Sequence, residues 1–323
     1  MFLQEWPLTF FTILSQMAVG AFIILGLIQV SSRRRVGAVA DKDRAEAKAQ
    51  ALERVSDAAL YAIGPLMVAG FIAAFFHLGN PMNGINVIRG VPSSPLAQEV
   101  MMGVGFAVLG FAFAATQWFH WGSSRLRFVL AIVTALWGLA FVWSMARLYM
   151  LPTIPHWDHW TTPAQFYVTT FLSGALAIGT ALAWFPKLRD KPWLNKLMPA
   201  NRRPADMSDT HVDYVNRLVQ RSLQGIGVLS VLLLPIELFV IIFAYSRPES
   251  VNPAAFAFPT GWFVLRLALL IIGAGLMGLF LARTKRDDIN LLLTLVMTSY
   301  ILVTISEVIG RFIFYGGMDR IGI

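Results

Sequence analysis

The hydrophobic positions of this chain fall into eight long runs separated by shorter polar segments. A helix needs about 20 consecutive apolar residues to cross a bilayer, and each run is long enough to do so. Uniformly apolar runs of this length do not suit the alternating strands of a membrane barrel. The pattern therefore predicts an all-α integral membrane protein, a single membrane domain built as an eight-transmembrane-helix bundle. The expected spans are residues 7–30, 57–77, 97–120, 126–150, 163–186, 222–245, 261–283 and 290–314.

Lysine and arginine residues are distributed unevenly between the two sides of this bundle. Segments 31–56, 121–128, 187–221 and 283–289 hold 20 of the 26 basic residues, and all four lie on one side. Loops rich in Lys and Arg stay in the cytoplasm. We therefore expect both termini to face outward, into the periplasm of a bacterium whose inner (plasma) membrane holds the chain. The net charge of +8 is then mainly an orientation signal, which favours anionic lipid and not nucleic acid as the partner.

Two of the basic segments are long. Residues 41–60 are rich in helix formers, so we expect them to extend the second helix into the cytoplasm. Segment 185–217 mixes proline, charge and Trp193, and it suits a docking surface and a plain linker equally well. Because four predicted spans precede this segment and four follow it, the domain could comprise two four-helix halves joined by a cytoplasmic linker at 187–221. Similarity between the halves is too weak to establish a repeat.

Seven ionisable residues lie within the predicted spans or at their ends, all in the outer half of the bilayer. Charged groups at such depth are costly and usually face a bundle interior or a site. Taken singly, an arginine could instead reach the headgroups, and Glu307 and Arg311 could pair one helical turn apart. Their shared depth favours a polar pocket that opens toward the outer surface. The seven are His77, Glu99, Arg147, Glu237, Arg266, Glu307 and Arg311.

A quinone suits a pocket of this kind. Its headgroup needs hydrogen-bond donors and proton acceptors, and its tail needs an apolar slot between helices. Quinol oxidation releases protons, which a histidine and a carboxylate near the outer surface could accept. His77 and Glu99 flank one short outer loop, so we predict that they exchange these protons. We extend the quinone pocket to Arg147, Glu307 and Arg311 on depth alone.

Cofactors bound by this protein itself are limited by its composition. The sequence contains no cysteine, which excludes an iron–sulfur cluster and a haem of the C-x-x-C-H type. Of the five histidines only His77 lies clearly at membrane depth, which disfavours a haem held by two histidines. We therefore expect no haem, no metal site and no covalently bound cofactor.

Two competing interpretations rest on short motifs. The spacing of His156 and His159 could bind a metal, but the adjacent Trp157 and Trp160 favour an aromatic belt at the membrane interface. A haem-free transporter or proton-path protein is a more remote alternative. It is supported by Pro235, which could kink the sixth span next to a glutamate.

Four stretches resemble the membrane anchor subunit of dimethyl sulfoxide reductase and related molybdoenzymes. They are "EWPLTFFTILSQMAVGAFI" near the start, "FFHLGNPMNGINVIRGVPSSPLAQEV" at 75–100, "FVWSMARLYM" at 141–150 and "EVIGRFIFYGGM" at 307–318. The resemblance implies eight helices, outward termini and quinol oxidation without haem. It also implies two partners, an iron–sulfur electron-transfer subunit and a molybdopterin catalytic subunit. The family's quinol-site histidine matches His77, and the acidic residue after the outer loop matches Glu99.

The resemblance thus implies a quinone- or quinol-binding anchor that exchanges electrons between the quinone pool and an iron–sulfur partner in anaerobic respiration. Such a subunit is part of an oxidoreductase and has no complete activity alone. The long inner segments 31–56 and 185–221 suit the alternative of a cytoplasmic sulfite-oxidising complex that reduces quinone. The predicted pocket near the periplasmic surface instead suits a partner subunit on the periplasmic side. The sequence leaves open the terminal substrate, the direction of electron flow and the choice between menaquinone and ubiquinone.

Overall fold

The computed structural model describes residues 6–37, 41–77, 84–188, 209–248, 260–284 and 289–316. Within these ranges the protein forms helices and no strand. Eight helices are long and apolar enough to cross a membrane, which confirms the predicted eight-span membrane bundle. Seven of them are continuous: α1 (Trp6–Gly37), α2 (Lys42–His77), α4 (Pro95–Trp118), α5 (Ser124–Tyr149), α6 (Thr161–Leu188), α8 (Asp209–Tyr245) and α12 (Ile289–Gly316).

The seventh span is interrupted by a π-helical turn. It consists of α10 (Thr260–Leu270), the π segment Ile271–Met277 and α11 (Gly278–Arg283). Ser299 on α12 donates a 2.7 Å hydrogen bond to the carbonyl of Gly273 inside the π segment. A side chain that captures a backbone carbonyl loosens the regular i to i−4 ladder, which is a common cause of such bulges. The apolar pattern predicted a regular helix here and contained no sign of this interruption.

The ends of several helices differ from the predicted span limits. The start of α2 at Lys42 confirms the predicted cytoplasmic extension of the second helix. The start of α8 at Asp209 was not expected, because the sequence suggested a linker or docking surface up to residue 217. A short outer helix, α3 (Gly84–Gly90), was also missed. Trp193 lies outside the described residues.

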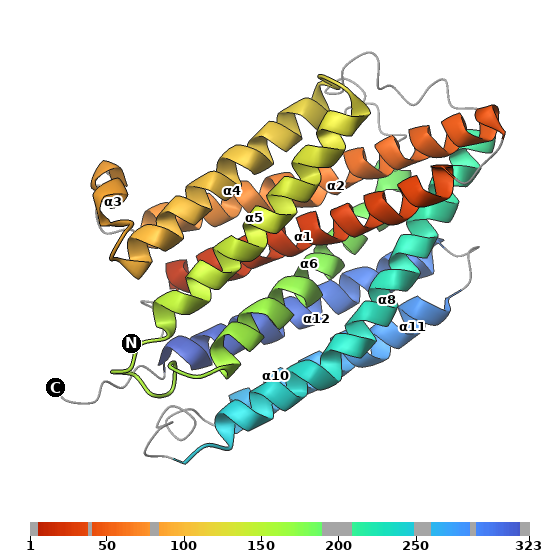
Figure 1. The fold of residues 1–323 in the computed structure, drawn as a ribbon. Coiled ribbons are helices and arrows are strands. Elements are labelled where there is room, and N and C mark those ends of the chain that lie inside the picture. Colours follow the sequence, from red (N-terminus) through yellow and green to blue (C-terminus); the bar gives the residue numbers. More distant parts are fainter. Residues whose placement is uncertain are drawn as a thin grey trace.

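The spans are arranged in layers (Figure 1). The antiparallel pair α4 and α5 forms one face, α1, α2 and α6 lie in the middle, and α8, α12 and the interrupted seventh span form the other face. The beginning of α1 and the end of α12 lie at the same end of the bundle, as an even number of spans requires, and Tyr315 donates a hydrogen bond to Thr12 there. That this end faces the periplasm remains a prediction from the distribution of basic residues.

Helices α1 and α6 form the centre of the bundle. Their most apolar windows are 78% and 83% buried, whereas those of the other six spans are 28–50% buried. The two helices touch at Gly20 and Gly174, where a Cβ on either residue would overlap the backbone of the opposite helix. In membranes, where lipid is as apolar as leucine, such small-residue contacts allow the backbones to pack closely. The packing of the central pair thus requires glycine at both positions.

We predict that Gly174→Ala destabilises the folded protein by about 1–3 kcal/mol or more, because the added methyl has no space between the two backbones. The measurement is the midpoint of thermal denaturation in detergent. Gly64→Ala on α2 is the matched control, since a Cβ there meets no atom within 4 Å. It should leave the midpoint unchanged or raise it slightly, because alanine favours helix more than glycine does. Equal midpoints for the two variants would refute the glycine contact.

Candidate functional site

Glu99 lies in the first turns of α4, buried beside a cavity. The helix begins after Ser94, whose hydroxyl accepts a 3.3 Å hydrogen bond from the amide of Ala97. Only 4% of the Glu99 surface is exposed. The cavity measures about 90 Å³, and among the described residues that line it Glu99 is the one that carries a charged group. The other lining residues are Phe11, Phe71, Ala74, Leu96, Val100, Gly103, Val104 and Phe141.

The cavity lies next to the lipid-facing surface of α4. Leu96 and Val104 line it and are 46% and 52% exposed, so they also form part of the outer face of the helix. On the inner side a Cβ at Gly103 would come within 3.1 Å of the Phe141 ring, so the glycine allows this ring to pack closely against α4. The volume is below the roughly 300–1,000 Å³ of common ligand pockets. A quinone headgroup would therefore displace lining side chains as it enters.

His77 is the last residue of α2, and its side chain lies outside the described part of the protein. It follows Ala74, a cavity-lining residue, by three positions. The two residues are therefore about one helical turn apart, and His77 is the nearer of the two to the end of α2. This placement is compatible with the predicted pairing of His77 and Glu99 but does not test it.

Arg147 does not line the cavity. It is exposed in the last turn of α5 and donates a 3.2 Å hydrogen bond to the side-chain oxygen of Gln98. Gln98 in turn donates a 3.0 Å hydrogen bond to the carbonyl of Val91. Arg147 thus ties α5 to the start of α4 next to Glu99, while its guanidinium reaches toward the surface as a membrane arginine commonly does.

A second buried polar cluster lies in the layer formed by α8, α10 and α12. Glu237, Arg266, Glu307 and Arg311 are each no more than 3% exposed. Thr169 on α6 donates a 2.7 Å hydrogen bond to one carboxylate oxygen of Glu307. Glu237 Oε2 and Glu307 Oε1 have no donor among the described residues, and the two carboxyl groups lie within hydrogen-bonding reach of each other. A bond between two carboxyl groups requires a proton on one of them.

The arginines of this cluster are held inside the bundle. Arg311 donates a 2.9 Å hydrogen bond to Gln16 on α1, and its guanidinium carbon lies 3.7 Å from the centre of the Phe166 ring. Arg266 lies against Gly310, where a Cβ would overlap its guanidinium. The interpretation that these two arginines reach the headgroups is therefore wrong. A private Glu307–Arg311 ion pair is also absent among the described residues.

Two tyrosines connect the Glu99 cavity with this cluster. The rings of Tyr149 on α5 and Tyr315 on α12 have centroids 5.3 Å apart, and the Tyr315 hydroxyl donates to Thr12 over 3.2 Å. Both tyrosines interact electrostatically with Glu99 and with Arg311. The site predicted from the sequence did not include these tyrosines, because the prediction was based on charged residues and a tyrosine in an apolar span is uncharged. Glu99 and the cluster around Glu307 and Arg311 thus occupy two buried places with the tyrosine pair between them, and they do not form one open pocket.

The outer loop between α5 and α6 differs from the aromatic belt that the sequence suggested. Trp157 is buried, donates a 3.0 Å hydrogen bond to the carbonyl of Phe314 and stacks on that ring. His156 is also buried, and neither ring nitrogen has a partner among the described residues. Trp160, at 45% exposed, is compatible with a belt. The described residues contain no group of three or more side chains that could hold a metal ion.

We predict that His156 makes the stability of the folded protein depend on pH. Burial, with the nearby Arg247 and His159, lowers the pKa of His156 from 6.5 to about 4. Between these values the unfolded state binds a proton that the folded state does not bind. Stability therefore falls as the pH drops from about 6.5 to 4, by up to roughly 3 kcal/mol.

Denaturation midpoints in detergent across this pH range test the prediction. His156→Phe should decline less steeply than the native protein, since phenylalanine keeps the packing against Tyr245 and Phe314 without a titrating ring. His159→Gln is the matched comparison. Burial lowers the pKa of His159 too, but its ring is more exposed, so this variant should keep most of the slope. Parallel curves for His156→Phe and the native protein would contradict the assignment.

Comparisons with known proteins agree with the resemblance seen in the sequence. A family model described as "DMSO reductase anchor subunit (DmsC)" matches residues 1–317. The sequence is 34% identical over 199 residues to the C subunit of the anaerobic dimethyl sulfoxide reductase of Escherichia coli, which is 61% of this protein and 63% of that one. It is 31% identical over 180 residues to the YnfH subunit of an anaerobic dimethyl sulfoxide reductase of the same organism, with coverage of 55% and 58%.

A third relative, the C subunit of the anaerobic dimethyl sulfoxide reductase of Haemophilus influenzae, is 31% identical over 176 residues, which is 53% of this protein and 56% of the relative. The matched segments therefore span less than two thirds of the length of each of these curated relatives.

Proposed function

Because the chain belongs to the family of DMSO reductase anchor subunits, we propose that it anchors a molybdoenzyme in the inner membrane and oxidises quinol there. In this proposal the electrons pass to an iron–sulfur subunit and from it to a molybdopterin catalytic subunit. The sequence contains no cysteine, so the metal cofactors belong to these partners. The observation that carries the proposal is the buried carboxyl of Glu99 in an otherwise apolar cavity beside the lipid-facing surface.

The cavity suits the two ends of a quinol. The headgroup enters from the bilayer past Leu96 and Val104, and the isoprenoid tail remains between α2 and α4 in contact with lipid. Glu99 accepts a hydroxyl proton as the ring is oxidised. His77, nearer the outer end of α2, passes a proton toward the surface. Arg147 positions the start of α4 through Gln98 without touching the headgroup.

Arg311 and Glu307 act at a distance from the headgroup in this account. The tyrosine pair Tyr149 and Tyr315 separates them from Glu99 and interacts electrostatically with both Glu99 and Arg311. Through this pair, the positive charge of Arg311 contributes to the electrostatic surroundings of the cavity. Arg311 and Glu307 therefore affect the electrostatic potential at the site, but they do not line the cavity.

A proton path through the second half of the bundle is the other candidate function. It is favoured by the facing carboxyl groups of Glu237 and Glu307, which can share one proton inside the membrane. Under this alternative the protein moves protons, and the Glu99 cavity is a packing defect.

Binding of a fluorescent quinol analogue to membranes that hold the assembled complex separates the two candidates. We predict saturable binding to the native protein, and weaker binding to His77→Ala and Glu99→Gln at normal protein levels. Glu237→Gln should bind like the native protein, because Glu237 does not line the cavity. The control is Glu46→Gln, the same chemical change at an exposed position near the opposite end of α2. If the quinol analogue does not bind saturably to the native complex, the proposed quinol site is wrong.

The rate of electron transfer is the second readout of these variants. Loss of a positioned proton acceptor commonly costs about 10²–10⁴ in rate, so Glu99→Gln should slow quinol oxidation by roughly 10² or more. Activity with an artificial donor that reduces the partner subunits directly should not change. If Glu237→Gln slows quinol oxidation and Glu99→Gln does not, the proton-path alternative replaces the quinol site.

A further inference from the structure

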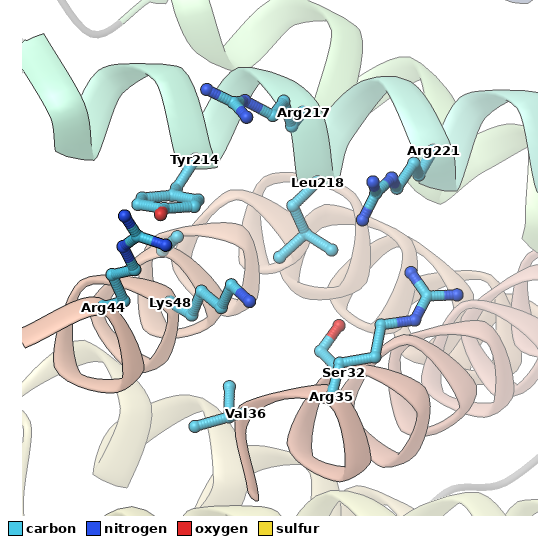
Figure 2. A pocket seen from close by; sticks show the side chains of 10 residues that line it. Ser32, Arg35, Val36, Arg44, Lys48, Tyr214, Arg217, Leu218 and Arg221 are labelled. Atoms are coloured by element: carbon cyan, nitrogen blue, oxygen red, sulfur yellow. The ribbon is translucent and has the colours of Figure 1, made fainter. Parts of the chain in front are cut away.

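A cluster of positively charged side chains surrounds a cavity at the opposite end of the bundle from Glu99. The cavity measures about 370 Å³ and lies between the end of α1 and the beginnings of α2 and α8. Figure 2 shows Arg35 and Arg221 extending toward each other from α1 and α8, with the amine of Lys48 directed into the space between the helices. Five cations line it: Arg35, Arg44, Lys48, Arg217 and Arg221.

Three of these cations have no acidic partner among the described residues. Arg44 pairs with Asp41 over 3.2 Å, and Arg217 pairs with Asp213 over 3.1 Å. Arg35, Lys48 and Arg221 form no such pair in the described part of the protein. Like charges gathered around one cavity repel each other. An anion inside the cavity would remove this repulsion and accept several charge-assisted hydrogen bonds.

A second cavity continues from the first toward the middle of the bilayer. It measures about 400 Å³ and shares Ser32, Arg35, Leu218 and Arg221 with the basic cavity. Its remaining walls are mostly apolar: they consist of Ile24, Leu27, Ile28, Gly225, Ile226 and Leu229, with the serines Ser31 and Ser222 nearer the basic end.

The length of this apolar cavity corresponds to one leaflet. At about 1.5 Å per residue, the walls extend roughly 16 Å from Arg35 to Ile24 along α1 and roughly 12 Å from Arg221 to Leu229 along α8. Half of the hydrocarbon core is about 15 Å thick. The apolar sequence of α1 ends at residue 30 and that of α8 begins at residue 222, so Arg35 and Arg221 lie at headgroup level.

We propose that the two cavities together bind one anionic phospholipid, with its phosphate between Arg35 and Arg221 and an acyl tail in the apolar cavity. A free phosphate or an acidic peptide would use the cations but would leave the apolar cavity unfilled. A neutral lipid would fill the apolar cavity but would leave the cations unpaired. Of these ligands, only an anionic lipid carries both a negative headgroup for the cations and an acyl tail for the adjoining apolar cavity.

Such a lipid would connect parts of the bundle that are distant in sequence. Its headgroup would bridge α1 and α2 to α8, and its acyl tail would fill the space between α1 and α8. A ligand that binds only the folded state stabilises it in proportion to the logarithm of its concentration over Kd. The assembled complex should therefore be more stable in membranes that contain anionic lipid, independently of whether the proposed quinol site is correct.

The test uses the complex purified in mild detergent, stripped of lipid and then supplied with phosphatidylglycerol or phosphatidylcholine. We expect native mass spectrometry to show about one phosphatidylglycerol retained per complex, together with a higher denaturation midpoint. Phosphatidylcholine should give neither result. The double variant Arg35→Gln and Arg221→Gln should lose both effects. The matched control, Arg34→Gln with Arg125→Gln, removes two exposed charges at the same end that do not line the cavity, so it should keep both.

A third variant distinguishes a lipid from a free anion. Gly225→Leu adds a side chain inside the apolar cavity, and a Cβ at this position meets no atom within 4 Å, so the helix should tolerate it. It leaves all five cations in place. We expect Gly225→Leu to retain less phosphatidylglycerol. The proposal is overturned if inorganic phosphate alone gives the full stabilisation, if Gly225→Leu retains lipid normally, or if the matched control loses lipid as fully as the double variant.

Discussion

The contact between α1 and α6 at Gly20 and Gly174 is the constraint on which the rest of the bundle depends. These helices are the most buried of the eight spans, and each of these two glycines meets the backbone of the opposite helix. One turn before Gly20, Gln16 accepts the hydrogen bond from Arg311, and Thr169 on α6 donates to Glu307. Because lipid supplies neither donors nor acceptors, a buried charge is tolerated only where other helices provide them. The glycine contact therefore holds the partners that make the carboxyl cluster possible.

The polar interior is divided between two places with different surroundings. Glu99 lies in an apolar cavity with access to lipid, whereas Glu307 and Arg311 are enclosed and hydrogen-bonded to α6 and α1. The first arrangement suits exchange with a molecule that arrives through the bilayer. The second arrangement holds its charged groups in fixed positions, away from lipid. The tyrosine pair on α5 and α12 lies between them and interacts electrostatically with Glu99 on one side and Arg311 on the other.

How much could be predicted from the sequence depended on the distance along the chain between interacting residues. Apolar run length located all eight spans, and local helix propensity correctly extended α2 to Lys42. The π segment depends on Ser299, a residue of another helix, and the buried position of Trp157 depends on Phe314. Membrane depth singled out the ionisable residues of the spans, but depth does not indicate which helices are neighbours. It therefore grouped Arg311 and Glu99 in one pocket, although two tyrosines lie between them.

In the proposed function, a quinone headgroup binds between α2 and α4 beside Glu99. Photolabelling tests it most directly: a quinone with a photoreactive azide on its ring is irradiated in membranes that hold the assembled complex, and the labelled peptides are sequenced. The account predicts label on the cavity-lining parts of α2 and α4, around Phe71–Ala74 and Leu96–Val104, that an excess of unlabelled quinone suppresses. Suppressible label confined to α8, α10 and α12 would contradict it.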